Sequence, residues 1–414
     1  MSNKSQTLIQ EFNITGLSSI GIKDVTRKKR IIAQMSNNDD ITINEVSESL
    51  NISIPKASEL IGSLLKEGFI KETGKRSVGK GRNASFYSLR SEGCYFLGVE
   101  IKKYKINIGI MGFDKVIIKS KLDIPFLYQE SGESLKEIIA IINEFLNELK
   151  IEKNKIAGVG ISVAGRINVR TGEILTIYHF SDAPIKSILE KELGLPVFID
   201  NDSRTIAYGE FHFGNRKKEN EVLVVNMDYG MAIGIFVGGK PVYGASGYAG
   251  ELSHIPLFDN ELICYCGKKG CLETEASGFA LIRKITALIE KGSNSILQKV
   301  LEKKGFIEIE DIIHAVDKGD NLTLQVLSEV AEKLGRGLAI TINIFNPELI
   351  IIGGSLSGLG EPLLLPLKTA IIEYSLNLVN KDTSIVTSAL QYKAGLLGCC
   401  LLVRDKILGL VVYH

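Results

Sequence analysis

The stretch Gly247-Tyr-Ala-Gly-Glu-Leu-Ser-His254, followed by Cys264-Tyr-Cys-Gly-Lys-Lys-Gly-Cys-Leu-Glu273, is the most specific pattern in this 414-residue chain. Three soft thiolates and one imidazole form a ligand set that closes a tetrahedral structural zinc site. The cysteine spacing lets one tight turn gather the sulfurs, with glycines supplying the unusual backbone angles. Buried structural cysteines are the alternative, but Lys268 and Lys269 are unlike the residues of a core strand. We therefore predict that Zn²⁺ is bound by His254, Cys264, Cys266 and Cys271.

The composition is that of an ordinary globular protein of two or three domains, with 45% apolar and 23% charged residues. The N-terminal residues 1–7 contain no apolar run typical of a signal peptide. No apolar stretch reaches membrane-spanning length. The remaining cysteines, Cys94, Cys399 and Cys400, lie in apolar surroundings and are expected to be reduced. These features predict a cytoplasmic protein without a membrane partner.

The charge is unevenly distributed along the chain. Residues 1–90 carry 14 Lys and Arg against 9 Asp and Glu, a net charge of +5, whereas the remaining residues have a net charge of −4. This difference favours a small basic module joined to a larger, mildly acidic domain. We expect the two domains to span residues 1–90 and 91–414.

Three helical segments are predicted in the basic module, at Val25–Met35, Asn44–Leu50 and Ile54–Gly68, with turns at Asp39–Thr42 and Asn51–Ser53. In the third helix, Ser53 is a suitable N-cap and a proline stands in the first turn. Its inward residues are expected to be Ala57, Leu60, Ile61, Leu64 and Leu65. Its outward residues are the small polar set that a recognition helix presents to a major groove, namely Ser53, Lys56, Ser58, Glu59 and Ser63.

The next segment, Phe69–Leu89, is predicted to be a β-hairpin with a tip rich in Gly, Lys and Arg. A helix-turn-helix followed by such a basic wing is a winged-helix arrangement. Its basic residues, Lys75, Arg76, Lys80 and Arg82, are expected to bind phosphates, and Arg82 is suited to entering a minor groove. The alternative is a small helical domain used for protein contacts. The favoured DNA-binding residues are therefore Ser53, Lys56, Ser58, Glu59, Lys80 and Arg82.

Strand-like and helical runs alternate beyond residue 93. A helix is expected at Glu133–Leu149. The predicted strands are Tyr95–Ile101, Lys105–Met111, Val116–Leu122, Ile156–Ser162, Val197–Asp200, Val222–Met227, Ile233–Val237 and Glu348–Gly354. Because a strand set occurs twice, the pattern predicts an α/β architecture with two similar lobes around a cleft.

Three segments together resemble the ROK family, which comprises repressors, open reading frames and sugar kinases. They are Gly244–His254 joined to the cysteine motif, Leu195-Pro-Val-Phe-Ile-Asp-Asn-Asp-Ser203, and Asn346-Pro-Glu-Leu-Ile-Ile-Ile-Gly-Gly354. The resemblance extends from the helix-turn-helix to Ala394–Gly398. It implies the two-lobed actin-like ATPase (ribonuclease H-like) fold, preceded by a winged-helix domain.

The resemblance also implies a sugar site. In family kinases an Asn-Asp pair binds sugar hydroxyls, and its aspartate is the general base; the matching residues are Asn201 and Asp202. Carboxylates and an amide suit vicinal hydroxyls, and an imidazole fixed by zinc has a defined tautomer. The full set implied to bind sugar is Gly165, Arg166, Asn201, Asp202, Glu251, His254 and Glu273.

The nucleotide-binding segments depart from the kinase pattern. Family kinases begin with Asp-x-Gly-Gly-Thr, whose glycines let backbone amides approach phosphates; the matching stretch is Glu100-Ile-Lys-Lys-Tyr104. The second phosphate loop reads Asp228–Gly234, with fewer glycines and an added carboxylate that repels phosphate. Gly353-Gly354 is retained, but Ser355 interrupts the adenosine region. We expect no ATP binding and no catalytic residue, with Asp202 a vestigial base, although Lys102 and Lys103 leave anion binding open.

These features predict a sugar-responsive transcriptional regulator, most simply a repressor. Its partners would be double-stranded operator DNA, a sugar or sugar-derivative effector, and further copies in a homodimer or homotetramer. The main alternative is an active ATP-dependent sugar kinase with a fused DNA-binding head. A protein-interaction module with a vestigial pocket is a third possibility.

Overall fold

The chain divides into two units in the computed structural model. The described residues are 18–37, 40–78, 82–168, 171–177 and 183–410. The first unit comprises Met1–Asn201 with Cys399–Tyr413, and the second comprises Asp202–Gly398 with His414. Helix α15 (Ala394–Leu408) contributes to both units, because a unit boundary falls inside it. None of the helices in the described part of the chain is long and apolar enough to span a bilayer.

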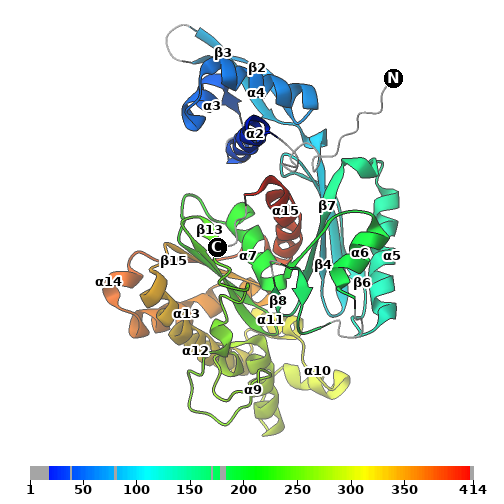
Figure 1. The fold of residues 1–414 in the computed structure, drawn as a ribbon. Helices are drawn as coiled ribbons and strands as arrows, with labels where there is room; N and C mark the ends of the chain where they lie inside the picture. Colours follow the sequence, from blue (N-terminus) through cyan, green and yellow to red (C-terminus); the bar gives the residue numbers. More distant parts are fainter. Residues whose placement is uncertain (1–17, 38–39, 79–81, 169–170, 178–182, 411–414) are drawn as a thin grey trace. The chain divides into compact units, whose positions relative to one another are not determined.

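The N-terminal module contains the three predicted helices and the predicted hairpin (Figure 1). Its helices are α2 (Ser19–Asn37), α3 (Ile43–Leu50) and α4 (Ile54–Glu67), and its strands are β1 (Ile41–Thr42), β2 (Ile70–Val78) and β3 (Arg82–Leu89). The turn expected at Asp39–Thr42 is in part wrong, since Ile41 and Thr42 pair with β3. The side chain of Ile41 is buried, which explains why this short segment becomes an edge strand instead of a turn. Asp39 lies outside the described residues.

Local capping explains where the second and third helices begin. Thr42 and Glu45 form a capping box, with Glu45 Oε2 accepting from Thr42 N at 2.7 Å. Ser53 caps α4 as predicted, because its Oγ accepts from Lys56 N at 3.4 Å. Helix α4 ends at Glu67, and the following Gly68 caps it with a left-handed φ of 81°. These signals, all local in sequence, fix the helix-turn-helix geometry.

A five-stranded sheet of order β10-β7-β4-β5-β6 organises the rest of the first unit. Its strands are β4 (Tyr95–Ile101), β5 (Lys105–Gly112), β6 (Ile117–Pro125), β7 (Ile156–Val163) and β10 (Val197–Asn201). Helices α5 (Gly132–Glu148) and α6 (Ile185–Leu193) cover one face, and α15 covers the other (Figure 1). A Cβ at Gly160 would stand 2.3 Å from Cys399 O, so glycine is required for α15 to approach β7. A small hairpin of β8 (Ile167–Asn168) and β9 (Glu173–Ile174) follows β7.

The helix-turn-helix shares a hydrophobic core with this sheet and with α15. The buried cluster joins Ile31 and Ile32 of α2 to Val403 and Leu408 of α15. The N-terminal module is therefore held within the first unit by apolar contacts with α15.

The second unit repeats the same sheet plan, in the order β13-β12-β11-β14-β15. Its strands are β11 (Val222–Met227), β12 (Met231–Val237), β13 (Lys240–Pro241), β14 (Leu349–Gly353) and β15 (Ser384–Thr387). Its helices are α7 (Asp202–Phe213), α8 (Glu273–Ala276), α9 (Gly278–Glu290), α10 (Leu297–Lys304), α11 (Ile309–Asp317), α12 (Asn321–Phe345), α13 (Glu361–Tyr374) and α14 (Asn377–Asn380). In both sheets three parallel strands are extended by two antiparallel strands. The predicted duplication of the lobes is confirmed.

Candidate functional site

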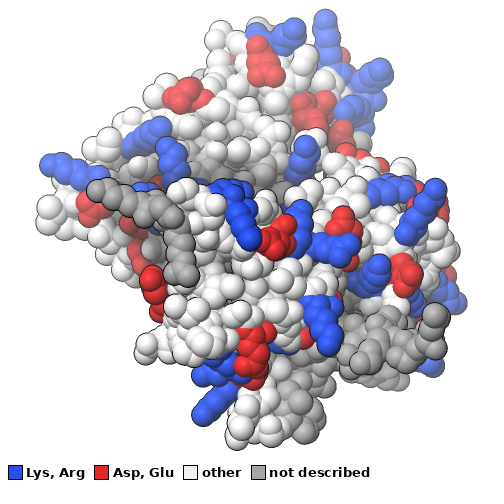
Figure 2. Space-filling view, turned by 90° about the horizontal axis from the view of Figure 1, so that it is seen from above, with Lys and Arg blue, Asp and Glu red and all other residues white. Residues whose placement is uncertain are grey.

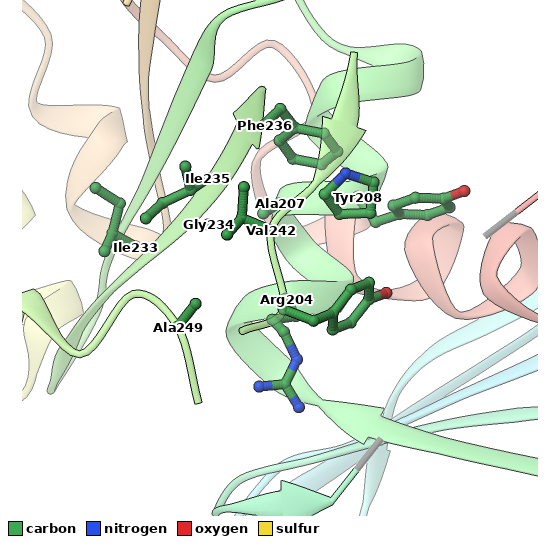
Figure 3. Close-up of a pocket in the computed structure, with 11 residues that line it drawn as sticks. Arg204, Ala207, Tyr208, Ile233, Gly234, Ile235, Phe236, Val242 and Ala249 are labelled. Carbon is green, nitrogen blue, oxygen red and sulfur yellow. The ribbon is translucent and has the colours of Figure 1, made fainter. Parts of the chain in front are cut away.

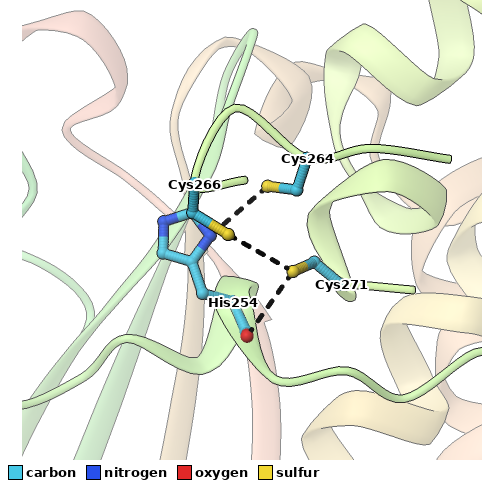
Figure 4. A group of neighbouring side chains, drawn as sticks. All are labelled: His254, Cys264, Cys266 and Cys271. Atoms are coloured by element: carbon cyan, nitrogen blue, oxygen red, sulfur yellow. Dashed lines mark hydrogen bonds between the residues drawn. The ribbon is translucent and has the colours of Figure 1, made fainter. Parts of the chain in front are cut away.

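The four predicted metal ligands lie together in the second unit (Figure 4). The ligand atoms of His254, Cys264, Cys266 and Cys271 are all within 4.8 Å of one another. Cys264 Sγ is 3.6 Å from His254 Nδ1, and the Sγ atoms of Cys266 and Cys271 are 3.6 Å apart. The sequence pattern therefore corresponds to a real cluster of four side chains that could hold a metal ion.

A tight turn positions the sulfurs. Cys264 N donates to Lys268 O at 2.8 Å, and Gly267, whose φ is +86°, donates back to Cys264 O at 2.8 Å. A Cβ at Gly270 would lie 2.0 Å from Phe258 O, so only glycine lets this strand of the turn pack closely. Gly267 is thus required by its backbone conformation alone, whereas Gly270, whose φ is +72°, is required by its conformation and by the close contact.

The electrostatics of the cluster favour a bound cation. Burial raises the pKa of Cys264, and burial together with the neighbouring thiols raises the pKa of Cys271 to about 12. Burial also acts on Cys266, but hydrogen bonds, first from the Lys268 backbone, outweigh it and lower its pKa. Three thiolates this close repel one another unless a cation compensates them. Because Lys268 and Lys269 are exposed, the surroundings are not those of a structural apolar core, and the donor set fits a metal.

Two of the predicted sugar-binding carboxylates flank His254. Glu273 Oε2 lies 3.5 Å from His254 Nδ1, and Glu251 Oε2 lies 3.6 Å from His254 Nε2. Burial, and to a smaller extent the charge of Glu251, raise the pKa of Glu273 to about 7, against an opposing hydrogen bond from Met231 N. Glu273 Oε2 is buried without a hydrogen-bond partner. The structure thus brings Glu251, His254 and Glu273 together.

A third group approaches the same histidine and was not anticipated from the sequence. Tyr265 Oη lies 3.0 Å from His254 Nε2, and the two rings meet edge to face with centroids 5.0 Å apart. Tyr265 stands between two of the cysteines, at a position where the motif accepts any residue. A contact of this kind depends on loop geometry, so no signal in the sequence could have identified it.

The remaining predicted sugar-binding residues lie at or just after the ends of β7 and β10. Asn201 Nδ2 donates to Gly165 O at 2.9 Å, which brings these two residues together, and Arg166 is exposed beside them in the chain. Asp202 is the first residue of α7, where Ser203 N donates to its Oδ1 at 2.7 Å. Gly165, Arg166 and Asn201 belong to the first unit, whereas Asp202 and the residues around His254 belong to the second.

The segment that matches the first kinase phosphate loop forms a tight turn and carries large side chains. Between β4 and β5, Lys102 N donates to Lys105 O at 2.9 Å. The Glu100 carboxylate is buried, accepts from Asn107 Nδ2 at 2.6 Å and lies 3.4 Å from Lys102 Nζ. This turn presents lysine side chains where the kinase motif has glycines.

The segment that matches the second kinase phosphate loop makes a hydrogen bond to the turn after β14. Ser355 Oγ, which follows β14, donates to Asp228 Oδ1 at 3.0 Å. Asp228, which stands where the kinase loop has a glycine, therefore lies beside Ser355, in the turn that matches the adenosine region of the kinases. A phosphate placed here would meet a negative charge.

The candidate DNA-binding residues differ in how accessible they are. Ser53, the cap of α4, is exposed, as are Ser58 and Glu59 within the helix. Lys56 is half-buried, and its Nζ lies 2.9 Å from Asp24 Oδ2 and 2.8 Å from Glu59 Oε1. In the wing, Lys75 is exposed, and Arg76 is held 2.6 Å from Asp40 Oδ2. Lys80 and the side chain of Arg82 lie outside the described residues. The space-filling view shows Lys and Arg side chains interspersed with Asp and Glu (Figure 2).

A separate shallow hollow lies between α7 and β12 and opens to solvent (Figure 3). Its lining is largely apolar and includes Ala207, Tyr208, Ile233 and Phe236, with Arg204 at one side. None of the predicted sugar-binding residues lines it. It does not form part of the candidate site.

Comparison with known families agrees with this architecture. Residues 96–406 match the family model described as ROK family, and residues 26–71 match a model described as winged helix-turn-helix DNA-binding. Since the first match covers more than half of the chain, the chain belongs to the ROK family, and it carries an N-terminal winged helix-turn-helix.

Individual relatives include both regulators and kinases. The chain is 28% identical over 388 residues to a xylose repressor from Caldicellulosiruptor bescii, covering 93% of this chain and 97% of the repressor. It is 31% identical over 319 residues to a glucokinase from Halalkalibacterium halodurans, covering 75% of this chain and 96% of the kinase. Among solved structures, a ROK family transcriptional regulator described as a homolog of the E. coli MLC protein has a TM-score of 0.80 and 27% identity, covering 94% of this chain and 98% of that one. The regulators thus match nearly the whole chain.

Proposed function

We propose that this protein is a sugar-responsive transcriptional repressor that does not use ATP. One observation carries the proposal: a winged helix-turn-helix is joined to a ROK domain in which the segments matching the two kinase phosphate loops carry the Lys102–Glu100 ion pair and the Ser355–Asp228 hydrogen bond. The alignment with a xylose repressor over nearly the full length of both chains supports the same function.

Sugar recognition is assigned to Gly165, Arg166, Asn201, Asp202, Glu251, His254 and Glu273. Carboxylates accept hydrogen bonds from vicinal hydroxyls, and the Asn201 amide can both donate and accept. The buried Glu273 Oε2, which has no hydrogen-bond partner, gains one when a sugar hydroxyl donates to it. Asp202 acts only as a hydroxyl acceptor, because no phosphoryl donor is bound.

The metal in this proposal is Zn²⁺, held by His254, Cys264, Cys266 and Cys271. A closed tetrahedral zinc site contributes folding energy and no catalysis. Its value for the sugar site is positional: with Nδ1 facing the sulfurs, His254 keeps its proton on Nε2 and directs it toward the ligand.

DNA binding is assigned to Ser53, the N-cap of α4, to Lys56, Ser58 and Glu59 of α4 itself, and to Lys80 and Arg82 of the wing. Two such modules read two half-sites a helical turn or more apart, so the active form is a homodimer or homotetramer. We assign the DNA-binding domain to residues 1–90 and the sugar-binding domain to 91–414, and we locate the repressor in the cytoplasm, where operator DNA is accessible.

Regulation requires that the sugar bind more tightly to one of two states that differ in DNA affinity. Helix α15 is suited to couple sugar binding to DNA binding, because a unit boundary falls inside it and it packs against α2 through Val403 and Leu408. A change in the arrangement of the units on sugar binding would in this way be transmitted to the helix-turn-helix.

The second candidate is an active sugar kinase with a DNA-binding head. The 31% identity to a glucokinase and the aspartate at the base position favour it. It predicts sugar-dependent formation of ADP that is lost in Asp202→Asn. A coupled assay that detects no ADP above the sugar-free rate would remove this candidate.

A thermal-shift screen of the zinc-loaded protein tests the proposal. Monosaccharides, N-acetylated sugars, sugar phosphates and ATP–Mg²⁺ are compared, because any ligand that binds only the native state raises the melting temperature. The proposal predicts a shift with one class of sugar and none with ATP–Mg²⁺. A clear shift with ATP–Mg²⁺ would contradict it, and so would no shift with any sugar.

A further inference from the structure

The hydroxyl of Tyr265 is hydrogen-bonded to His254 Nε2, the ring nitrogen that is expected to contact the sugar. Its Oη lies 3.0 Å from His254 Nε2, while His254 Nδ1 faces Cys264 Sγ at 3.6 Å. Figure 4 shows the two ring nitrogens in these different settings, one turned toward the sulfurs and the other away from them. With Nδ1 directed at the metal position, Nε2 carries the proton and donates to the phenol oxygen.

The phenol oxygen and a sugar hydroxyl are the same kind of acceptor for this N–H. Glu251 Oε2 lies 3.6 Å from the same nitrogen, on the side chain expected to accept from the sugar. A sugar hydroxyl that accepted from Nε2 and donated to Glu251 would take the place now held by Tyr265 Oη. The two groups cannot both make a linear hydrogen bond to one N–H.

The position of Tyr265 keeps its side chain close to His254 and also lets that side chain move away. Its backbone lies between Cys264 and Cys266, so two sulfur ligands fix where the side chain begins. The Tyr265 residue, however, is 78% exposed, whereas the side chain of His254 is largely buried. An exposed aromatic ring can rotate into solvent without leaving a cavity, and the main loss is one hydrogen bond.

We propose that Tyr265 is an internal competitor of the sugar, whose hydroxyl holds His254 Nε2 in the ligand-free protein and must be displaced for binding. This inference rests on the proposed sugar function. It makes Tyr265 a specificity-determining residue: a ligand with a hydroxyl that reaches both His254 and Glu251 compensates for the displaced phenol. A ligand without that hydroxyl leaves Tyr265 in place and binds weakly.

Calorimetric titration of Tyr265→Phe with D-xylose and with D-glucose tests the proposal. Removing the hydroxyl removes the competition, so we expect the dissociation constant to fall by about twofold to tenfold, the range of one net hydrogen bond. Tyr392→Phe, at another exposed tyrosine in the same unit, is the matched control and should leave the constant unchanged. Metal content, measured by mass spectrometry, should equal that of the parent protein in both variants.

Unchanged affinity in Tyr265→Phe would overturn the proposal, and weaker binding would show that the phenol is a sugar contact instead. If neither the parent nor the variants bind any sugar, the proposed function fails, and Tyr265 is judged by a sugar-free measurement. In ¹⁵N-histidine-labelled protein, the Nε2 proton of His254 should exchange with water faster in Tyr265→Phe than in Tyr392→Phe. Equal exchange rates would show that Tyr265 does not occupy this nitrogen.

Discussion

Arg404 of α15 donates a hydrogen bond to Ser36 Oγ of α2, and so joins the last described helix to the first. Arg404 is 1% exposed, and its Nη1 pairs with Asp405 Oδ1 at 2.6 Å. A buried guanidinium at this position connects the ROK domain directly with the DNA-binding module. It gives α15 a polar contact with α2 in addition to the apolar packing.

The first prediction concerns this buried pair. Arg404→Met removes the cation and leaves the Asp405 carboxylate buried without it, so we expect a loss of about 3–5 kcal/mol in the free energy of unfolding. Lys119→Met, which breaks the exposed contact with Glu148, should cost at most about 1 kcal/mol. Urea unfolding of both variants measures the difference. Similar losses in the two would mean that Arg404 is not a buried anchor.

The second prediction concerns pH. Burial raises the pKa of Glu210 in α7 to about 7, although Ser388 Oγ donates to its Oε1. The unfolded chain releases this proton near the ordinary glutamate pKa, so the stability from neutral Glu210 is full below about pH 4.5 and is lost as pH rises through about 7. The loss amounts to roughly 3 kcal/mol.

Glu210→Gln should remove this dependence, because its side chain stays neutral at every pH. Relative to this variant, the parent protein should be more stable at pH 5 than at pH 8, as measured by the difference in melting temperature. Glu144→Gln, at an exposed site, controls for the loss of one negative charge. The account of Glu210 is wrong if the difference between parent and variant is the same at both pH values.

The third prediction concerns the metal. The parent protein should contain about one zinc per chain, and Cys271→Ser should lose it together with several degrees of melting temperature. Cys94→Ala changes a buried thiol outside the cluster and should keep the metal. Because the thiols must lose protons to bind, chelators should strip the ion more readily at pH 6 than at pH 8. Full zinc content in Cys271→Ser would argue against this ligand set.

The fourth prediction concerns the wing. Lys75 is exposed, whereas Arg76 is already paired with Asp40 at 2.6 Å. Lys75→Ala should therefore weaken binding to all DNA sequences alike and reduce the salt dependence by about one unit of slope. Arg76→Ala should have the smaller effect. Anisotropy titrations at several salt concentrations would contradict this ordering if Arg76→Ala lowered the slope more.

Much of the fold could be predicted because its signals are local. The limits of β4 and β11 agree with the expected strands residue for residue, since apolar runs are bounded by clear breaks. Ser53 was predicted as the cap of α4 for the same reason. The metal cluster was also predictable, because its ligand types and spacing are specific to one kind of chemistry.

What escaped prediction depends on contacts between distant segments. Strand β1 has two residues and exists only because β3 pairs with it. The hydrogen bond from Arg404 to Ser36 joins residues at opposite ends of the chain. The partners of Lys56 and Arg76, which are Asp24 and Asp40, lie more than 30 residues away, so local sequence could not identify these ion pairs. The approach of Tyr265 to His254 depends on how one turn folds back over a ring.

The most direct test of the repressor account is an anisotropy titration of a DNA fragment that the protein selects from a random-sequence library. The titration is repeated with the sugar that shifts the melting temperature and with ATP–Mg²⁺. We expect the sugar to change the dissociation constant for DNA at least about fivefold, ATP–Mg²⁺ to have no effect, and Asp202→Asn to abolish the response to sugar. Identical DNA affinity with and without the sugar, or a response to ATP–Mg²⁺ alone, would contradict a sugar-responsive repressor that does not use ATP.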